Sequence, residues 1–163
     1  MKYAEAYGMW DIILKELHKE SEREKFLALL KARPSGKVDW RVIELIKYLR
    51  TKKFKLGLLS NNSAAGASEA RQIDLNSLFD SVLFSVEIGF MKPEIEVFKK
   101  LADALQVDAT ELIFIDDLSQ NLSTASEIGY EPILYKDFPD LLHQLIKLNI
   151  LNFEEVEMLG CES

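Results

Sequence analysis

The sequence contains four short apolar segments, and their arrangement limits the folds that the chain can adopt. The segments cover residues 54–60, 81–86, 112–116 and 131–135. Each is apolar at most positions, which is typical of strands that are covered on both faces. Helical patterns separate them along the chain. Strands and helices that alternate in this way predict an α/β fold with a mainly parallel sheet and helices on both faces.

The helical patterns have recognisable ends. Asp39 is a predicted N-cap for the helix that follows it. Pro93 is predicted to open a helix with an apolar inner face. Gly129 is predicted to end a helix that begins near Ser119. A closing helix is predicted over residues 138–148.

We expect three parts along the chain. Residues 1–37 carry two amphipathic helical patterns and end at the Pro34–Gly36 break. Residues 38–150 hold the alternating strands and helices. Residues 151–163 contain four glutamates and no lysine or arginine, which predicts an acidic C-terminal helix or tail.

Composition argues against two classes of partner. The net charge of −7 leaves no basic face for nucleic acid. No apolar run approaches the roughly 18 residues that span a bilayer, so no membrane partner is expected. The single cysteine, Cys161, has no partner for an internal disulfide, and the N-terminus has no signal-peptide pattern. These features predict a reduced, cytoplasmic protein.

Polar residues follow the predicted strands at the edge where parallel strands end. Ser60 and Asn61 follow the first strand, Lys92 follows the second, and the third ends at Asp116 and Asp117. Ligands collect at this edge in open α/β sheets, so we expect Ser60, Lys92 and Asp116 to converge there. A hydroxyl and backbone N–H groups can hold phosphoryl oxygens, a lysine can offset their charge, and paired carboxylates can hold Mg²⁺. The combination favours phosphoryl chemistry.

The chain resembles the haloacid dehalogenase-like (HAD) hydrolase superfamily, and most of all its phosphatases with a small helical cap. Three of the family's motifs are matched in order, by Leu58–Asn61, by Gly89–Pro93 with Phe98, and by Phe114–Asp117 followed by Asn121 and Ala125. The resemblance implies a HAD-like Rossmannoid core over residues 38–150 and a helical cap remnant over residues 1–37. It also implies a phosphatase-type hydrolase that acts on a small phosphorylated metabolite.

The resemblance implies roles for the residues that follow the first and second strands. Ser60 would hydrogen-bond the transferring phosphoryl group, and Asn61 would shape the loop beside it. Lys92 would stabilise the phosphoryl charge. Ser60 and Lys92 are therefore the expected catalytic residues, and Ser60, Asn61 and Lys92 the expected substrate-binding residues.

The resemblance also implies a metal site. Asp116 would bind Mg²⁺ directly or through water, Asp117 would support it, and Asn121 would fix the acidic loop from the helix behind it. Mg²⁺ is thus the expected cofactor.

One family motif is missing from the sequence. Such enzymes carry Asp-x-Asp at the end of a first, central strand, where the first aspartate attacks phosphorus. The only acid among apolar neighbours near the N-terminus is Asp11, which lies in a helical pattern. We therefore expect a chain that begins inside the cap, binds Mg²⁺ weakly and is inactive.

The absent central strand would leave a gap in the sheet. We expect one of three arrangements: the strands ending at Ser60 and Asp116 pair directly, the N-terminal segment fills the gap, or a partner chain binds there. Direct pairing is the preferred expectation, because residues 3–17 have a helical pattern. It would remove unpaired backbone groups that cost about 1–3 kcal/mol each when buried.

Two other functions stay open at this stage. One is a non-catalytic HAD-like scaffold or regulatory binding protein. The other is a phosphoacceptor receiver-like domain, which also uses an acidic pair, a hydroxyl and a lysine; the order of these residues along the chain argues against it. Taken singly, Ser60–Asn61 also fits a turn, and Asp116–Asp117 fits a helix N-cap.

Overall fold

The computed structural model describes residues 39–72 and 74–160 of the chain. The predicted N-terminal cap segment, including Asp11, and Cys161 lie outside these residues, so the predicted three-part division of the chain stays a prediction. The described elements, in chain order, are α3 (Trp40–Thr51), β1 (Gly57–Ser60), α4 (Ala64–Ala70), α5 (Leu75–Leu78), β2 (Ser81–Phe84), α6 (Ser85–Ile88), α7 (Ile95–Leu105), η2 (Ala109–Glu111), β3 (Ile113–Asp116), α8 (Ser119–Glu127), β4 (Glu131–Leu134), α9 (Phe138–Lys147) and α10 (Phe153–Gly160).

The α/β fold and the four strands are confirmed. Strand β1 pairs with β2 and β3 pairs with β4, and both pairs are parallel. The helix ends also follow the sequence. The Asp39 side chain caps α3 by accepting from Arg41 N at 3.0 Å, and Gly129 takes the positive φ of 104° that ends α8. Pro93 lies two residues before α7 instead of opening it.

The expectation that the strands ending at Ser60 and Asp116 pair directly is wrong. The four described strands form two separate two-stranded sheets, β1–β2 and β3–β4. The pairs are joined through side chains instead, because one core cluster contains Leu59 of β1 and Phe114 of β3. Ile115 of β3 is 40% exposed. Backbone groups beside this partly exposed residue can bond to water, and groups that do so avoid the penalty that made pairing seem necessary.

The core that unites the two sheets lies under α7 and α8. Helix α7 contacts β1, β2 and α8, and its apolar face predicted from the sequence is buried, with Phe98 fully enclosed. The Phe98 ring meets Phe114 of β3 edge to face at 5.1 Å. Such packing fixes the separation of the two sheets without backbone pairing.

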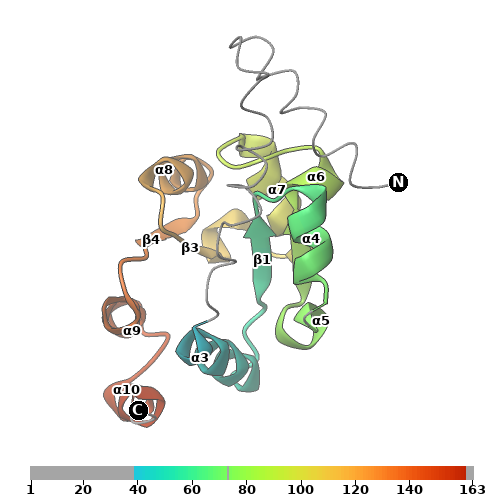
Figure 1. The fold of residues 1–163 in the computed structure, drawn as a ribbon. Coiled ribbons are helices and arrows are strands. Elements are labelled where there is room, and N and C mark those ends of the chain that lie inside the picture. The colour runs from blue at the N-terminus through green and yellow to red at the C-terminus, as the bar shows by residue number, and fades with distance from the viewer. Residues whose placement is uncertain (1–38, 73, 161–163) are drawn as a thin grey trace, which may run out of the picture.

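A second core lies on the other face of β3 and β4. It joins Ile133 of β4 to Leu45 of α3 and Leu145 of α9. Figure 1 shows α8 on one side of this strand pair and α9 on the other. The strands are therefore covered on both faces, as their apolar sequences predict.

The outer edge of β4 has fewer free hydrogen-bonding groups than an ordinary strand edge. Tyr135 N donates to Asp116 O, and this bond fixes which residues of β4 bond β3. With this register, the backbone N–H and C=O positions of Pro132 and Leu134 face away from β3. Pro132 has no N–H to donate. The Leu134 carbonyl accepts from Gln144 Nε2 of α9 at 3.3 Å. The Pro132 carbonyl and the Leu134 N–H are the outward groups of these two residues that remain for a neighbouring strand to bond.

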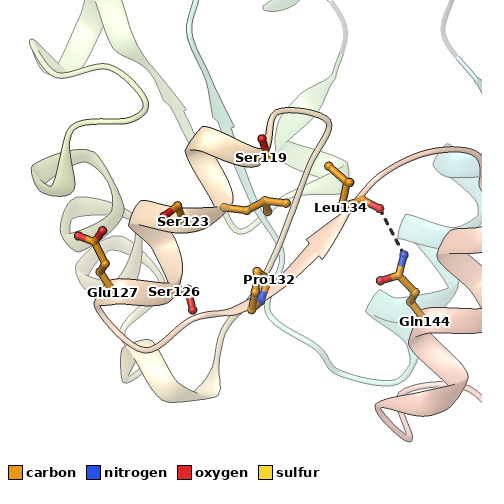
Figure 2. Close-up of a pocket in the computed structure, with 8 residues that line it drawn as sticks. Ser119, Ser123, Ser126, Glu127, Pro132, Leu134 and Gln144 are labelled. Atoms are coloured by element: carbon orange, nitrogen blue, oxygen red, sulfur yellow. Dashed lines mark hydrogen bonds between the residues drawn. The ribbon is translucent and has the colours of Figure 1, made fainter.

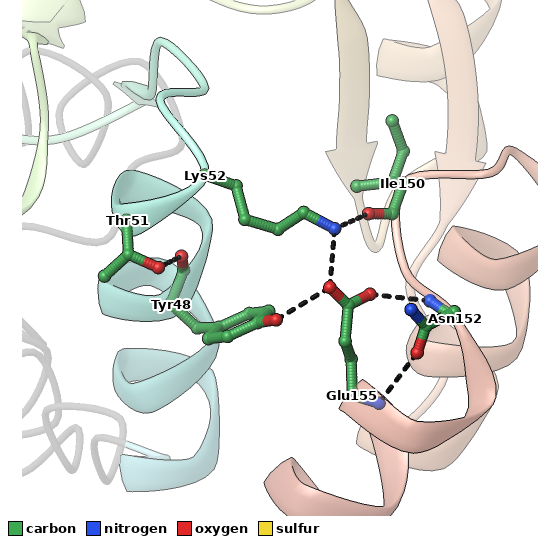
Figure 3. A network of polar contacts seen from close by, with 6 residues as sticks. All are labelled: Tyr48, Thr51, Lys52, Ile150, Asn152 and Glu155. Carbon is green, nitrogen blue, oxygen red and sulfur yellow. Dashed lines mark hydrogen bonds and ion pairs between the residues drawn. The ribbon is translucent and has the colours of Figure 1, made fainter.

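Helix α10 is held against α3 by a polar network around Glu155 (Figure 3). Glu155 Oε1 accepts from Tyr48 Oη at 2.7 Å and from Lys52 Nζ at 2.7 Å. Lys52 also donates to the Ile150 carbonyl at 2.9 Å, and Asn152 and Glu155 exchange two hydrogen bonds. The acidic C-terminal segment is thus a helix whose first turn is bonded to α3. In residues 39–72 and 74–160, no helix is long and apolar enough to cross a membrane.

We expect acid to loosen α10. The hydrogen bonds from Lys52 and Tyr48 lower the pKa of Glu155 to about 2. A lowered carboxyl pKa contributes stability above its ordinary value and loses it as the pH falls through the folded-state value. NMR signals of α10 and of Tyr48 should therefore shift together between about pH 4.5 and pH 2, and Glu155→Gln should abolish that shift. An unchanged acid transition in the variant would contradict the assignment.

Candidate phosphoryl site at the strand ends

The residues that end β1 and β3 meet through Lys92. Lys92 lies in the segment between α6 and α7, and its Nζ donates to Asp116 Oδ2 at 2.6 Å. The two side chains are 14% and 4% exposed. The ammonium also lies 5.6 Å from the centroid of the Phe114 ring. An ion pair that is largely shielded from water therefore lies at the carboxyl end of β3. Lys92 and Asp116 converge there, as the sequence predicted.

Asp116 is held by donors on both of its oxygens. Oδ1 accepts from Leu118 N at 2.9 Å and from the Asn121 side chain at 2.9 Å, while Oδ2 accepts from Lys92. Burial raises the pKa of Asp116, but the hydrogen bonds from Lys92, Leu118 and Asn121 outweigh it and hold the pKa below its ordinary value. The carboxylate is thus charged and fixed in orientation, and Asn121 has the supporting position that the sequence predicted.

Asn61 joins the end of β1 to the same group. Its Nδ2 donates to the Lys92 carbonyl at 2.8 Å, and its Oδ1 accepts from Lys92 N at 2.7 Å. Both ends of the side-chain amide therefore bond the backbone of Lys92. A contact between Asn61 and substrate stays a prediction.

The two other predicted site residues lie at the ends of the same strands. Ser60 is the last residue of β1 and is partly buried. Asp117 follows β3 and is exposed. Asp117 directly follows Asp116 in the sequence. The convergence of Ser60 with Lys92 and Asp116, and the roles of Ser60 and Asp117, stay predictions.

Sequence reasoning missed Ser85. Its Oγ accepts from Asn62 N at 3.0 Å and donates to the Asn62 carbonyl at 3.3 Å. Ser85 directly follows β2, so it is a polar residue at a strand end. That is the same signal that identified Ser60, and it was available in the sequence.

The two carboxylates at the end of β3 are compatible with Mg²⁺ if other groups complete its coordination shell. The described residues contain no cluster of three or more His, Cys, Asp or Glu that would hold a metal by itself. Mg²⁺ is commonly bound by one or two protein carboxylates, with waters and substrate phosphate completing the shell. Asp117 is exposed, and Asp116 Oδ2 accepts a single bond from protein, from Lys92. The pair therefore fits an ion that binds together with a phosphoryl group.

A surface pocket of about 690 Å³ lies elsewhere, between α8, β4 and α9 (Figure 2). Its wall includes Ser119, Ser123 and Ser126 of α8, with Pro132 and Leu134 of β4. Neither Lys92 nor Asp116 lines it. The pocket is separate from the ion pair, and its size gives no reason to move the candidate site.

The sequence of the chain matches the model of a known protein family, in agreement with the order of the residues at the strand ends. The model for the haloacid dehalogenase-like hydrolases matches residues 5–129. The chain belongs to the haloacid dehalogenase-like hydrolase family. Its HAD-like fold is thereby established together with the parallel α/β architecture described above.

Individual relatives show what kinds of HAD-like protein the chain is similar to. It is 28% identical over 123 residues to bifunctional epoxide hydrolase 2 from Sus scrofa, covering 72% of this chain and 22% of that protein. It is 29% identical over 130 residues to D-ribitol-5-phosphate phosphatase from Bacteroides thetaiotaomicron, covering 74% of this chain and 59% of that protein. The chain thus spans less than two thirds of each of these relatives.

A solved structure supports the same fold. It is a wild-type HAD-family enzyme from Bacteroides thetaiotaomicron in complex with magnesium and inorganic phosphate, with a TM-score of 0.59 and 26% identity. The match covers 64% of this chain and 57% of that one. Relatives of this HAD-like chain therefore include phosphatases, and a HAD-family structure that it resembles holds Mg²⁺.

Proposed function

We propose that this chain carries the phosphoryl-binding part of a HAD-family phosphatase site for a small phosphorylated metabolite. The observation that carries the proposal is the Lys92–Asp116 ion pair, 2.6 Å long and shielded from water at the strand ends. The similarity to a phosphatase named for D-ribitol 5-phosphate supports the substrate class. Finer identity within that class would depend on residues around the site.

In this proposal each residue acts on the phosphoryl group or its counter-ion. The Ser60 hydroxyl and nearby backbone N–H groups bind phosphoryl oxygens, and Lys92 offsets their negative charge. Asp116 and Asp117 hold Mg²⁺, which supplies positive charge beside the phosphoryl group when it is bound. Asn121 keeps the Asp116 carboxylate in one orientation through its 2.9 Å hydrogen bond.

We further propose that a polypeptide of these 163 residues binds but does not hydrolyse. Its sequence contains no Asp-x-Asp at all. A phosphatase that forms a covalent intermediate needs a carboxylate nucleophile that can reach phosphorus. Asp116 is a poor substitute, because both of its oxygens already accept hydrogen bonds from protein. The alternative function that this favours is a non-catalytic HAD-like scaffold or regulatory binding protein.

Two measurements on the purified 163-residue polypeptide test the proposal. We expect no Mg²⁺-dependent hydrolysis of p-nitrophenyl phosphate or of sugar phosphates above background. We also expect saturable binding of inorganic phosphate in the presence of Mg²⁺, and weaker but still measurable binding by Lys92→Met. Turnover that Asp116→Asn abolishes would contradict the inactivity, whereas turnover that this change leaves intact would point to a contaminant. Wild-type protein that binds no phosphate would reject the phosphoryl site itself.

A further inference from the structure

The side chain of Asn61 makes a two-point contact with a residue far along the chain. Its amide donates to the Lys92 carbonyl at 2.8 Å and accepts from Lys92 N at 2.7 Å, across a separation of 31 residues. A turn-forming asparagine instead bonds its own backbone one or two residues away. The interpretation of Ser60–Asn61 as simple turn chemistry therefore does not describe what this side chain does.

Two hydrogen bonds in opposite senses define an orientation as well as a position. The planar amide of Asn61 meets both polar backbone groups of one residue, much as a neighbouring strand would. The Cα of Lys92 is thereby fixed relative to Asn61, the residue that directly follows β1. The lysine side chain is long and flexible, so the position of its backbone limits which points its ammonium can reach, and the bond to Asp116 selects one of them.

The loop that carries Asn61 is itself held from the other side. Ser85, directly after β2, bonds both the N–H and the carbonyl of Asn62, at 3.0 and 3.3 Å. The ammonium of Lys92 is then held by Asp116 at 2.6 Å. A continuous series of contacts thus runs from the end of β2 to the end of β1, to Lys92, and to the end of β3.

We propose that Asn61 is a positioning residue that fixes Lys92 for contact with the phosphoryl group, with Ser85 supporting it. The inference rests on the proposed function for its purpose, since the phosphoryl group is what Lys92 serves. Its structural content is independent of that purpose. Without the Asn61 amide, the Lys92 backbone would move relative to β1, and its ammonium would leave Asp116 for solvent part of the time.

The first test measures how accessible the Lys92 ammonium is. Amine acylation, followed by peptide mass spectrometry, gives the modification rate of Lys92 relative to Lys47, an exposed lysine on α3. We expect Asn61→Ala to raise the relative rate about tenfold, the order of magnitude for losing a hydrogen-bonded pair. Asn62→Ala is the matched control, because it removes the neighbouring side-chain amide and leaves the backbone contacts of Ser85 in place. Equal Lys92 rates in these two variants would overturn the proposal.

A milder variant keeps the test decisive if Asn61→Ala does not fold. Ser85→Ala removes only the support of the loop, so we expect a smaller rise in the Lys92 rate, in the same direction, in protein with unchanged circular dichroism. An unchanged Lys92 rate in folded Ser85→Ala, with Asn61→Ala unfolded, would count against the positioning role.

The second test separates positioning from general stabilisation. The dissociation constant of inorganic phosphate, at saturating Mg²⁺, is compared among wild type, Asn61→Ala, Lys92→Met and the double variant. If Asn61 acts through Lys92, each single change weakens binding and the double variant binds no more weakly than Lys92→Met. Additive losses would overturn the proposal. Wild type that fails to bind phosphate would reject the proposed function, while the acylation rates would still decide the role of Asn61.

Discussion

Replacing Lys92 with methionine should destabilise the protein by about 3–5 kcal/mol at neutral pH, the usual effect of removing one partner of a buried ion pair. Methionine has a similar volume, so the loss would arise from charge and not from a cavity. The Asp116 carboxylate, 4% exposed, would keep only the donors Leu118 N and Asn121 Nδ2. Urea unfolding without added Mg²⁺ measures the effect.

The pH dependence of the same variant should have the opposite sign to that of wild type. In wild type the pKa of Asp116 is lowered, so its contribution is present above the ordinary value of about 3.9 and is lost as the pH falls below it. In Lys92→Met, burial would raise the pKa of Asp116, and acid would stabilise the variant by protonating it. The difference between the two proteins should therefore shrink as the pH falls from neutral.

Two further variants serve as a control and as a rescue for Lys92→Met. Lys47→Met removes the lysine of an exposed pair with Glu44 and should change stability by no more than about 0.5 kcal/mol. Lys92→Met combined with Asp116→Asn should recover much of the loss, because no buried charge is left unpaired. A Lys92→Met protein as stable as wild type across the pH range would show that the ion pair is not closed in solution.

Amide hydrogen exchange should be at least about tenfold faster on one edge of β1 and β3 than on the other edge of the same strand. This ratio corresponds to a difference of about 1.4 kcal/mol in opening free energy. The bond from Ser81 N to Leu56 O and the strand register turn Leu58 toward β2 and Leu59 away from it. By the same alternation Phe114 bonds β4 and Ile115 faces away. We expect slow exchange at Leu58 and Phe114, and fast exchange at Leu59 and Ile115.

The slow amides serve as internal controls, since they lie on the same strands. Equal and strong protection of Leu59 and Ile115 would mean that a further strand pairs with these edges. A dilution series would then distinguish the two sources: protection that falls with dilution indicates a second chain, and protection that persists indicates another part of the same chain.

The sequence predicted the strands and the convergence of Lys92 with Asp116 for a clear physical reason. Short apolar runs must be buried, and the carboxyl ends of parallel strands share an edge, so Lys92 and Asp116 had to approach one another. The helix ends at Asp39 and Gly129 followed from capping chemistry that acts over a few residues. Local rules and one rule of sheet geometry were sufficient for these features.

Other features depended on contacts that no local pattern contains. The division into two sheets and the packing of Phe98 against Phe114 are tertiary features that no local sequence pattern specifies. The bonds between Asn61 and Lys92 join residues 31 positions apart, and an asparagine after a strand fits a turn equally well. The energetic argument for direct strand pairing assumed that the facing edges were dry, whereas Ile115 is 40% exposed.

The reduced hydrogen-bonding capacity of the outer β4 edge affects association. Open sheet edges are templates on which other chains assemble into extended ribbons. Pro132 removes a donor from this edge, and Gln144 occupies the Leu134 carbonyl at 3.3 Å. At the β4 side, then, the protein offers a neighbouring strand one backbone acceptor and one donor, which makes a weak template for stacking into open-ended aggregates. A strand would add more readily at the edges of β1 and β3 that face away from their partner strands, where the register leaves the N–H and C=O groups of Leu59 and Ile115 unpaired by β2 and β4.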